Sequence, residues 1–124
     1  MLNTEKAYPT VGVKDMAAAR KFYEGPLGLR EVANEGADFI TYRTNGSRLL
    51  VYKSAFAGTN EATAVTWIVA DVEKAVKELK AHGVAFEHYD MPGMKLEGDV
   101  HVGGNVKVAW FKDPDGNIHS VAEE

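Results

Sequence analysis

Val11–Met16 (VGVKDM) is the segment from which the architecture of this chain can be worked out, because its pattern recurs further along as Trp67–Val72 (WIVADV). Each copy begins with a short run rich in β-branched residues and has an aspartate, Asp15 or Asp71, as its fifth residue. Self-similarity of this kind is typical of a duplicated structural unit. The two halves of the chain can therefore be aligned on these two aspartates.

The residues after each aspartate have the pattern of a short amphipathic helix. A carboxylate there accepts hydrogen bonds from the free N–H groups of the first turn, so Asp15 and Asp71 are predicted to be N-caps. A glycine, Gly28 or Gly83, follows each helical stretch. Buried positions are expected at the i, i+3, i+4 and i+7 spacing, which selects Met16, Ala19, Arg20 and Tyr23 in one copy and Val72, Ala75, Val76 and Leu79 in the other.

The remainder of each half is predicted to form strands separated by turns. In the first half they lie near 29–34, 38–43 and 48–53, with Asn45-Gly46 as a hairpin signal. In the second half they lie near 84–89, 98–102, 105–112 and 117–122, with a turn at Asp113–Asn117. We therefore predict an α+β fold of two tandem βαβββ modules, about 5–54 and about 62–122, within a single domain spanning 1–124.

Composition excludes several classes of protein. With 45% hydrophobic and 26% charged residues, the 124-residue chain has the make-up of a globular domain, and it has no cysteine for disulfides or thiolate chemistry. The net charge is −4 and the cations are scattered, so no nucleic-acid partner is expected. The polar start and the lack of a long apolar run predict a cytoplasmic protein with no membrane partner.

Three further segments occur in a characteristic order along the chain. They are Val13-Lys14-Asp15 with Phe22-Tyr23 and Leu27-Gly28-Leu29, then Asp71 with Leu79 and Gly83-Val84, then Phe111–Asn117. Together they resemble the glyoxalase, bleomycin-resistance and extradiol dioxygenase superfamily, also called vicinal-oxygen-chelate proteins. The resemblance spans essentially the whole chain and implies that the two modules form one cup-shaped mixed β-sheet with the helices outside. It also implies a homodimer, since family members commonly pair.

Metal-using members of that family hold a divalent ion inside the cup with His, Gln or Glu ligands. The resemblance places the ligand positions at Tyr8, Leu50, Ala64 and Ser120, and none of these is a usual ligand. No cofactor is therefore expected, and a divalent metal is the alternative.

The four histidines are the groups that would rebuild a metal site. His82 is expected at the end of the second helix, and His119 is expected to point away from the pocket because successive strand residues face opposite sides. For His88 and His101, exposed positions and positions at the pocket rim are both open.

Strand alternation gives the residues expected to face the ligand. Trp110 is the first choice for a stacking contact, with a core position as the alternative, whereas Trp67 is expected in the core. Residues 87–99, rich in Gly, Pro, Met and aromatic side chains, are expected to form either a lid or a long hairpin. The predicted ligand-binding residues are Tyr8, Thr10, Arg48, Leu50, Tyr52, Thr66, Val108, Trp110 and Ser120.

The leading functional hypothesis is metal-independent binding of a small, partly aromatic or amphipathic molecule, with sequestration of a drug or metabolite as the role, as in the bleomycin-resistance branch. Arg48, Tyr8, Tyr52 and Thr66 would orient that ligand. The alternative is an enzyme of the same superfamily, a lyase, isomerase or dioxygenase, with non-standard metal ligands or metal-free acid/base chemistry from Tyr8 or Tyr52. A third hypothesis is a module that dimerises and docks to a partner protein.

Overall fold

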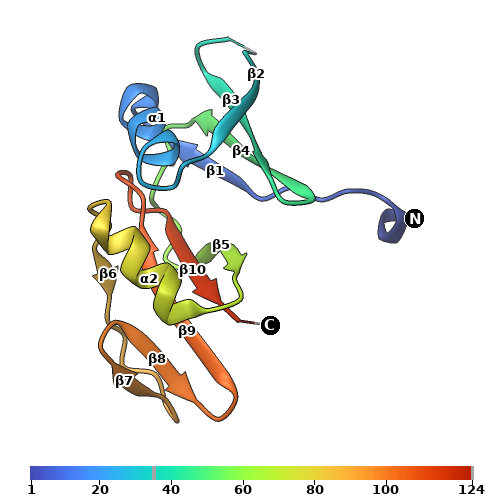
Figure 1. Cartoon of the computed structure of the whole chain (residues 1–124). Helices are drawn as coiled ribbons and strands as arrows, with labels where there is room; N and C mark the ends of the chain where they lie inside the picture. Colours follow the sequence, from blue (N-terminus) through green and yellow to red (C-terminus); the bar gives the residue numbers. More distant parts are fainter. Residues whose placement is uncertain (35, 124) are drawn as a thin grey trace.

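The computed structural model describes residues 1–34 and 36–123 of the chain (Figure 1). A short 3-10 helix, η1 (Leu2–Thr4), precedes the first module. That module runs through β1 (Thr10–Val13), α1 (Met16–Glu24), β2 (Arg30–Asn34), β3 (Phe39–Thr44) and β4 (Ser47–Lys53). The second module runs through β5 (Thr63–Ile68), α2 (Val72–Ala81), β6 (Phe86–Glu87), β7 (Lys95–Glu97), β8 (Val100–Gly103), β9 (Val106–Lys112) and β10 (Ile118–Ala122).

The strands form two sheets, one for each module (Figure 1). The first has the order β1-β4-β3-β2, and the second has the order β5-β10-β9-β8-β7, with β6 paired to β9. In each sheet the first strand of the module is parallel to its last strand, and the remaining pairs are antiparallel. The α+β fold and the duplicated module are thus confirmed. One cup common to both modules stays a prediction, because no strand of the first sheet pairs with the second among the described residues.

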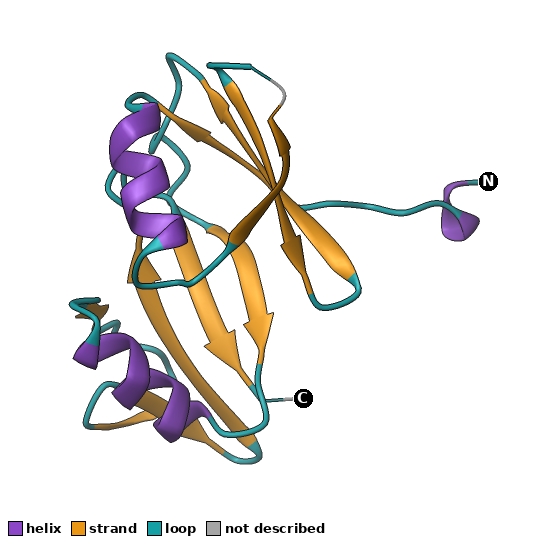
Figure 2. Ribbon diagram, turned by 45° about the horizontal axis from the view of Figure 1, so that its top comes forward, coloured by secondary structure: helices purple, strands orange, loops and turns teal. Residues whose placement is uncertain are grey.

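Both helices begin where the sequence predicts and bury the expected face. The backbone N–H of Ala18 donates to Asp15 Oδ1 at 3.1 Å, and that of Lys74 donates to Asp71 Oδ1 at 3.1 Å. Figure 2 shows the two helices on one side of the molecule, each beside the sheet of its own module. Neither described helix has the length and hydropathy that crossing a membrane would require. Buried helix residues include Ala19, Tyr23, Val72 and Val76.

The predicted strand at 84–89 is wrong in extent. Only Phe86–Glu87 is extended against β9, and a strand that the sequence analysis missed, β7, pairs with β8 as a hairpin. The reason lies at Tyr89, whose backbone N–H donates to the ring of His101 at 3.0 Å instead of to a neighbouring strand. Residues after β6 therefore leave the sheet ladder early.

The turn at Asp113–Asn117 joins the two modules. Tyr23 of α1 donates its hydroxyl to Asp113 Oδ2 at 2.7 Å, and the Asn117 side-chain amide donates to the Gly12 carbonyl of β1 at 2.7 Å. Gly58, in the segment between the modules, has a φ of +72° and lies so close that an added Cβ would be 1.7 Å from the Asp115 carbonyl oxygen. The motif is thus a junction as well as a turn.

Candidate functional site

The predicted ligand residues lie on the face of each sheet opposite to its helix, which we call the open face. Val11 and Val51 are buried in the core against α1, so Thr10 and Leu50, which pair with each other, take the other face of the first sheet. In the second sheet Ser120 is paired with both Thr66 and Trp110. The open face of the first sheet carries Thr10, Arg48, Leu50 and Tyr52, with Tyr8 just before β1 and beside Arg48, and that of the second carries Thr66, Val108, Trp110 and Ser120.

These two groups are separate within the chain. No hydrogen bond or ring contact between described residues joins a member of one group to a member of the other. On the first sheet, Tyr8 and Arg48 line a shallow basic hollow of about 290 Å³ together with Lys6, Arg43, Thr44, Gly46 and Ser47. A single chain therefore presents two part-sites. That the two form one ligand site stays a prediction.

The open face of the second sheet carries an aromatic cluster centred on Trp110. The indole N–H donates to Thr63 Oγ1 at 3.1 Å, which fixes the ring. Tyr89 and His101 meet this ring edge-on, with centroid distances of 5.3 and 4.8 Å. We call Tyr89, His101 and Trp110 the aromatic cluster. It has the apolar surface that ligand pockets commonly present.

His101 and Tyr89 are the residues that the sequence analysis missed. His101 is 1% exposed, so it lies neither in solvent nor at a rim, the two positions left open for it. Two polar atoms of the cluster, His101 Nδ1 and the Tyr89 hydroxyl oxygen, are buried without a hydrogen-bond partner among the described residues. One signal was present in the sequence: Val100 and Val102 pack on the α2 side, so alternation places His101 on the open face.

The other three histidines are engaged elsewhere. His119 lies on the helix side, as predicted, where Trp67 Nε1–H donates to its Nδ1 at 3.0 Å and the Tyr23 hydroxyl is 2.9 Å from its Nε2. Burial lowers the pKa of His119 to about 4, against a smaller opposing effect of the Asp113 carboxylate. His88 is 2.7 Å from Asp99, and His82 caps α2. None of these three faces the aromatic cluster.

The positions where the family would hold a metal ion do not fit one. Leu50 and Ala64 have no ligand atom, and the hydroxyl oxygens of Ser120 and Thr66 are 2.8 Å apart and hydrogen-bond each other. The described acidic cluster that could hold an ion lies at the start of α2, away from the open faces, and consists of Asp71, Glu73 and Glu123. Its members already serve the fold, because Glu123 accepts from the Val72 N–H and Glu73 pairs with Lys107.

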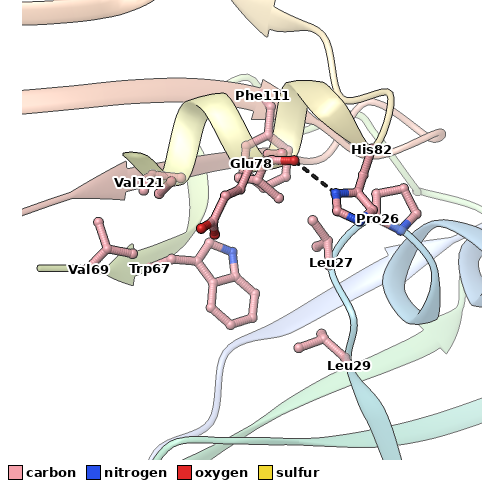
Figure 3. Close-up of a pocket in the computed structure, with 11 residues that line it drawn as sticks. Pro26, Leu27, Leu29, Trp67, Val69, Glu78, His82, Phe111 and Val121 are labelled. Atoms are coloured by element: carbon pink, nitrogen blue, oxygen red, sulfur yellow. Dashed lines mark hydrogen bonds between the residues drawn. The ribbon is translucent and has the colours of Figure 1, made fainter. Parts of the chain in front are cut away.

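A second hollow, of about 290 Å³, lies between α2 and the chain that follows α1 (Figure 3). Its walls are mostly apolar and belong to the core around Phe111 and Val121. Its polar groups include the exposed side chains of Glu78 and His82. His82 Nδ1 lies 2.9 Å from the backbone carbonyl oxygen of Glu78. No predicted ligand residue lines it. We interpret it as a packing seam between the modules, and place the candidate site at the aromatic cluster instead.

Comparison with known proteins agrees with this architecture. The family model "Glyoxalase/Bleomycin resistance protein/Dioxygenase superfamily" matches residues 7–120. No curated protein matched the chain.

Several solved structures share the fold. They include TnmS3, an antibiotic binding protein from Streptomyces sp. CB03234, with 19% identity, 99% of this chain and 98% of that chain covered, and a TM-score of 0.72. A fosfomycin resistance protein, FosX from Listeria monocytogenes, has 14% identity, coverage of 98% and 93%, and a TM-score of 0.72. A superfamily member from Sphaerobacter thermophilus has 22% identity, full coverage of both chains and a TM-score of 0.68. At these identities the likeness shows a common fold.

Proposed function

The chain belongs to the glyoxalase/bleomycin resistance protein/dioxygenase superfamily, and from that premise we propose that it binds a small, partly aromatic molecule without a metal ion. The observation that carries the proposal is the open face of the second sheet, where Trp110 stands among aromatic rings and buried polar atoms. The four positions of the family's metal ligands, filled by Tyr8, Leu50, Ala64 and Ser120, support the metal-free part. Structural neighbours described as antibiotic-binding or fosfomycin-resistance proteins make sequestration of a drug or metabolite the favoured role.

Binding fits the chemistry of the cluster better than proton transfer. The Tyr89 backbone N–H occupies Nε2 of His101, so the ring has no free lone pair with which to remove a proton from a substrate. Burial raises the pKa of Tyr89, and the nearby Glu87 carboxylate raises it further. This hydroxyl is therefore a hydrogen-bond donor at neutral pH and not a base. The cluster can orient a ligand but has no evident general base.

Chelation of metals should leave ligand binding unchanged. We would screen flat aromatic antibiotics and metabolites by thermal shift and then titrate the best compound by calorimetry before and after treatment with EDTA. The expected dissociation constants agree within about twofold, because no metal contributes to the site. Trp110→Ala should weaken binding about tenfold and Trp110→Phe less, since the phenyl ring keeps part of the stacking contact. A tenfold loss after chelation, restored by zinc or manganese, would contradict the proposal.

We also propose that the protein is a homodimer. The two part-sites lie on separate sheets of one chain, and apolar side chains near them are exposed, with Ile68 at 57% and Tyr52 at 40%. The strands β1 and β5 each leave one edge unpaired among the described residues, which is a surface that a second copy can cover. Light scattering on a size-exclusion column should give twice the 13.5 kDa mass of the chain. If the mass is that of one chain at all concentrations up to about 100 μM, the dimer is excluded.

A further inference from the structure

Two buried polar atoms of the aromatic cluster have no hydrogen-bond partner among the residues that the structure describes, and they lie on neighbouring side chains. His101 Nδ1 and the Tyr89 hydroxyl oxygen are both shielded from solvent, and the two rings are 6.3 Å apart at their centroids. Buried polar groups are nearly always hydrogen-bonded, and an unmade bond costs free energy. Two such groups on neighbouring rings indicate a hydrogen-bond partner that is not part of the described chain.

The hydrogen-bonding role of His101 follows from its neighbour. A backbone N–H can only donate, so the Tyr89 N–H at 3.0 Å requires His101 Nε2 to be the acceptor. The proton of the neutral ring is then on Nδ1. His101 therefore presents an N–H donor, and the Tyr89 hydroxyl can present a second donor.

The charges around the cluster favour a neutral partner. Lys112, which follows Trp110 on the same face of β9, has its Nζ 3.5 Å from Glu87 Oε1 on β6. The nearby cation is thus already compensated by a carboxylate. A carboxylate or phosphonate placed beside His101 would find no uncompensated cation among the described residues of β6, β8 and β9 that surround the cluster, because the remaining lysine there, Lys107, pairs with Glu73.

We propose that His101 Nδ1–H and the Tyr89 hydroxyl are the polar anchors of the ligand, and that the ligand carries a neutral acceptor oxygen, such as a ketone carbonyl, on a flat aromatic frame. The flat frame is chosen to stack on the indole of Trp110, which both anchor rings contact edge-on. This inference rests on the proposed function, and it specifies the chemical class of ligand for that site.

The test uses two probes of nearly the same shape, 9-fluorenone and fluorene, which differ only at carbon 9, a carbonyl group in fluorenone and a methylene group in fluorene. The full-length protein should bind fluorenone more tightly than fluorene by about 25- to 100-fold, the worth of two hydrogen bonds at about five- to tenfold each. Tyr89→Phe should reduce this preference to the share of the His101 anchor without lowering the melting temperature, because the lost hydroxyl has no hydrogen-bond partner among the described residues. Histidine ¹⁵N spectra should show the Nδ1 signal of His101 shifting with fluorenone and not with fluorene.

Tyr42→Phe is the matched control. It deletes a hydroxyl that donates to Glu24 in the first module, far in the fold from the aromatic cluster, so both probes should bind as to the wild type. Equal affinity for fluorenone and fluorene, or a Tyr89→Phe variant that keeps the whole preference, would overturn the inference. If another compound from the thermal-shift screen binds and neither probe does, the inference fails while small-molecule binding stands. If no small molecule binds, the proposed function fails as well.

Discussion

Replacing Asp113 by alanine should lower the free energy of unfolding by about 3–5 kcal/mol, because several donors lose their acceptor at once. Asp113 Oδ2 accepts from the Tyr23 hydroxyl and from the Asn117 side-chain amide, at 2.7 and 2.8 Å. Its Oδ1 accepts from the backbone N–H groups of Asp115 and Asn117, at 3.0 and 2.8 Å. Asp113 is only 4% exposed, so water cannot readily take the place of its carboxylate. We expect both the turn and the module junction to weaken.

The measurement is urea unfolding followed by far-UV circular dichroism, with two comparison variants. Asp15→Ala removes an exposed N-cap whose carboxylate accepts one hydrogen bond, from the Ala18 backbone N–H, so it should cost about 1 kcal/mol. Asp113→Asn keeps the shape but turns an NH₂ group toward other donors, and it should be intermediate. If Asp113→Ala costs no more than Asp15→Ala, the junction does not depend on this carboxylate.

Local patterns explain why so much of the fold was predictable. An N-cap aspartate, a helical stripe and a terminating glycine are each set by residues within a few positions of one another, and both halves of the chain carry them. Strand alternation is equally local, and it correctly placed His119 on the helix side and Trp110 on the open face. The repeated module followed from applying the same local rules twice.

Contacts between distant residues explain what the sequence analysis missed. The Asp113–Asn117 motif was predicted as a turn, whereas its partner Tyr23 lies in the other module and no local pattern connects the two. The sequence does not decide between exposure and a pocket rim for His101, because its burial depends on Tyr89, which reaches it only when the chain leaves the ladder after β6. The sequence predicts one wall for the nine ligand residues, yet they lie on two sheets, and strand alternation alone does not say how sheets are placed.

Lowering the pH from 7 to 4 should cost the protein about 3 kcal/mol of stability through His119 alone. Burial lowers the pKa of His119 to about 4 in the folded state, whereas an unfolded histidine has its ordinary pKa of 6.5. Between these values the unfolded chain binds the proton and the folded chain does not, so each step down in pH favours unfolding. The contribution of the neutral ring is complete above about pH 6.5 and is lost as the pH falls toward 4.

His119→Gln isolates this effect, because a glutamine can accept from Trp67 Nε1–H and donate to the Tyr23 hydroxyl without titrating. At pH 7 we expect the free energy of unfolding of His119→Gln to be lower than that of the wild type. Between pH 7 and 4 it should fall less than the wild-type value does, so the difference between the two proteins should change by about 3 kcal/mol. Carboxylates that protonate below pH 5 act on both proteins, so the difference between the two curves reports on His119. Parallel curves for the wild type and His119→Gln would mean that the buried ring takes up its proton without opening the junction between the modules.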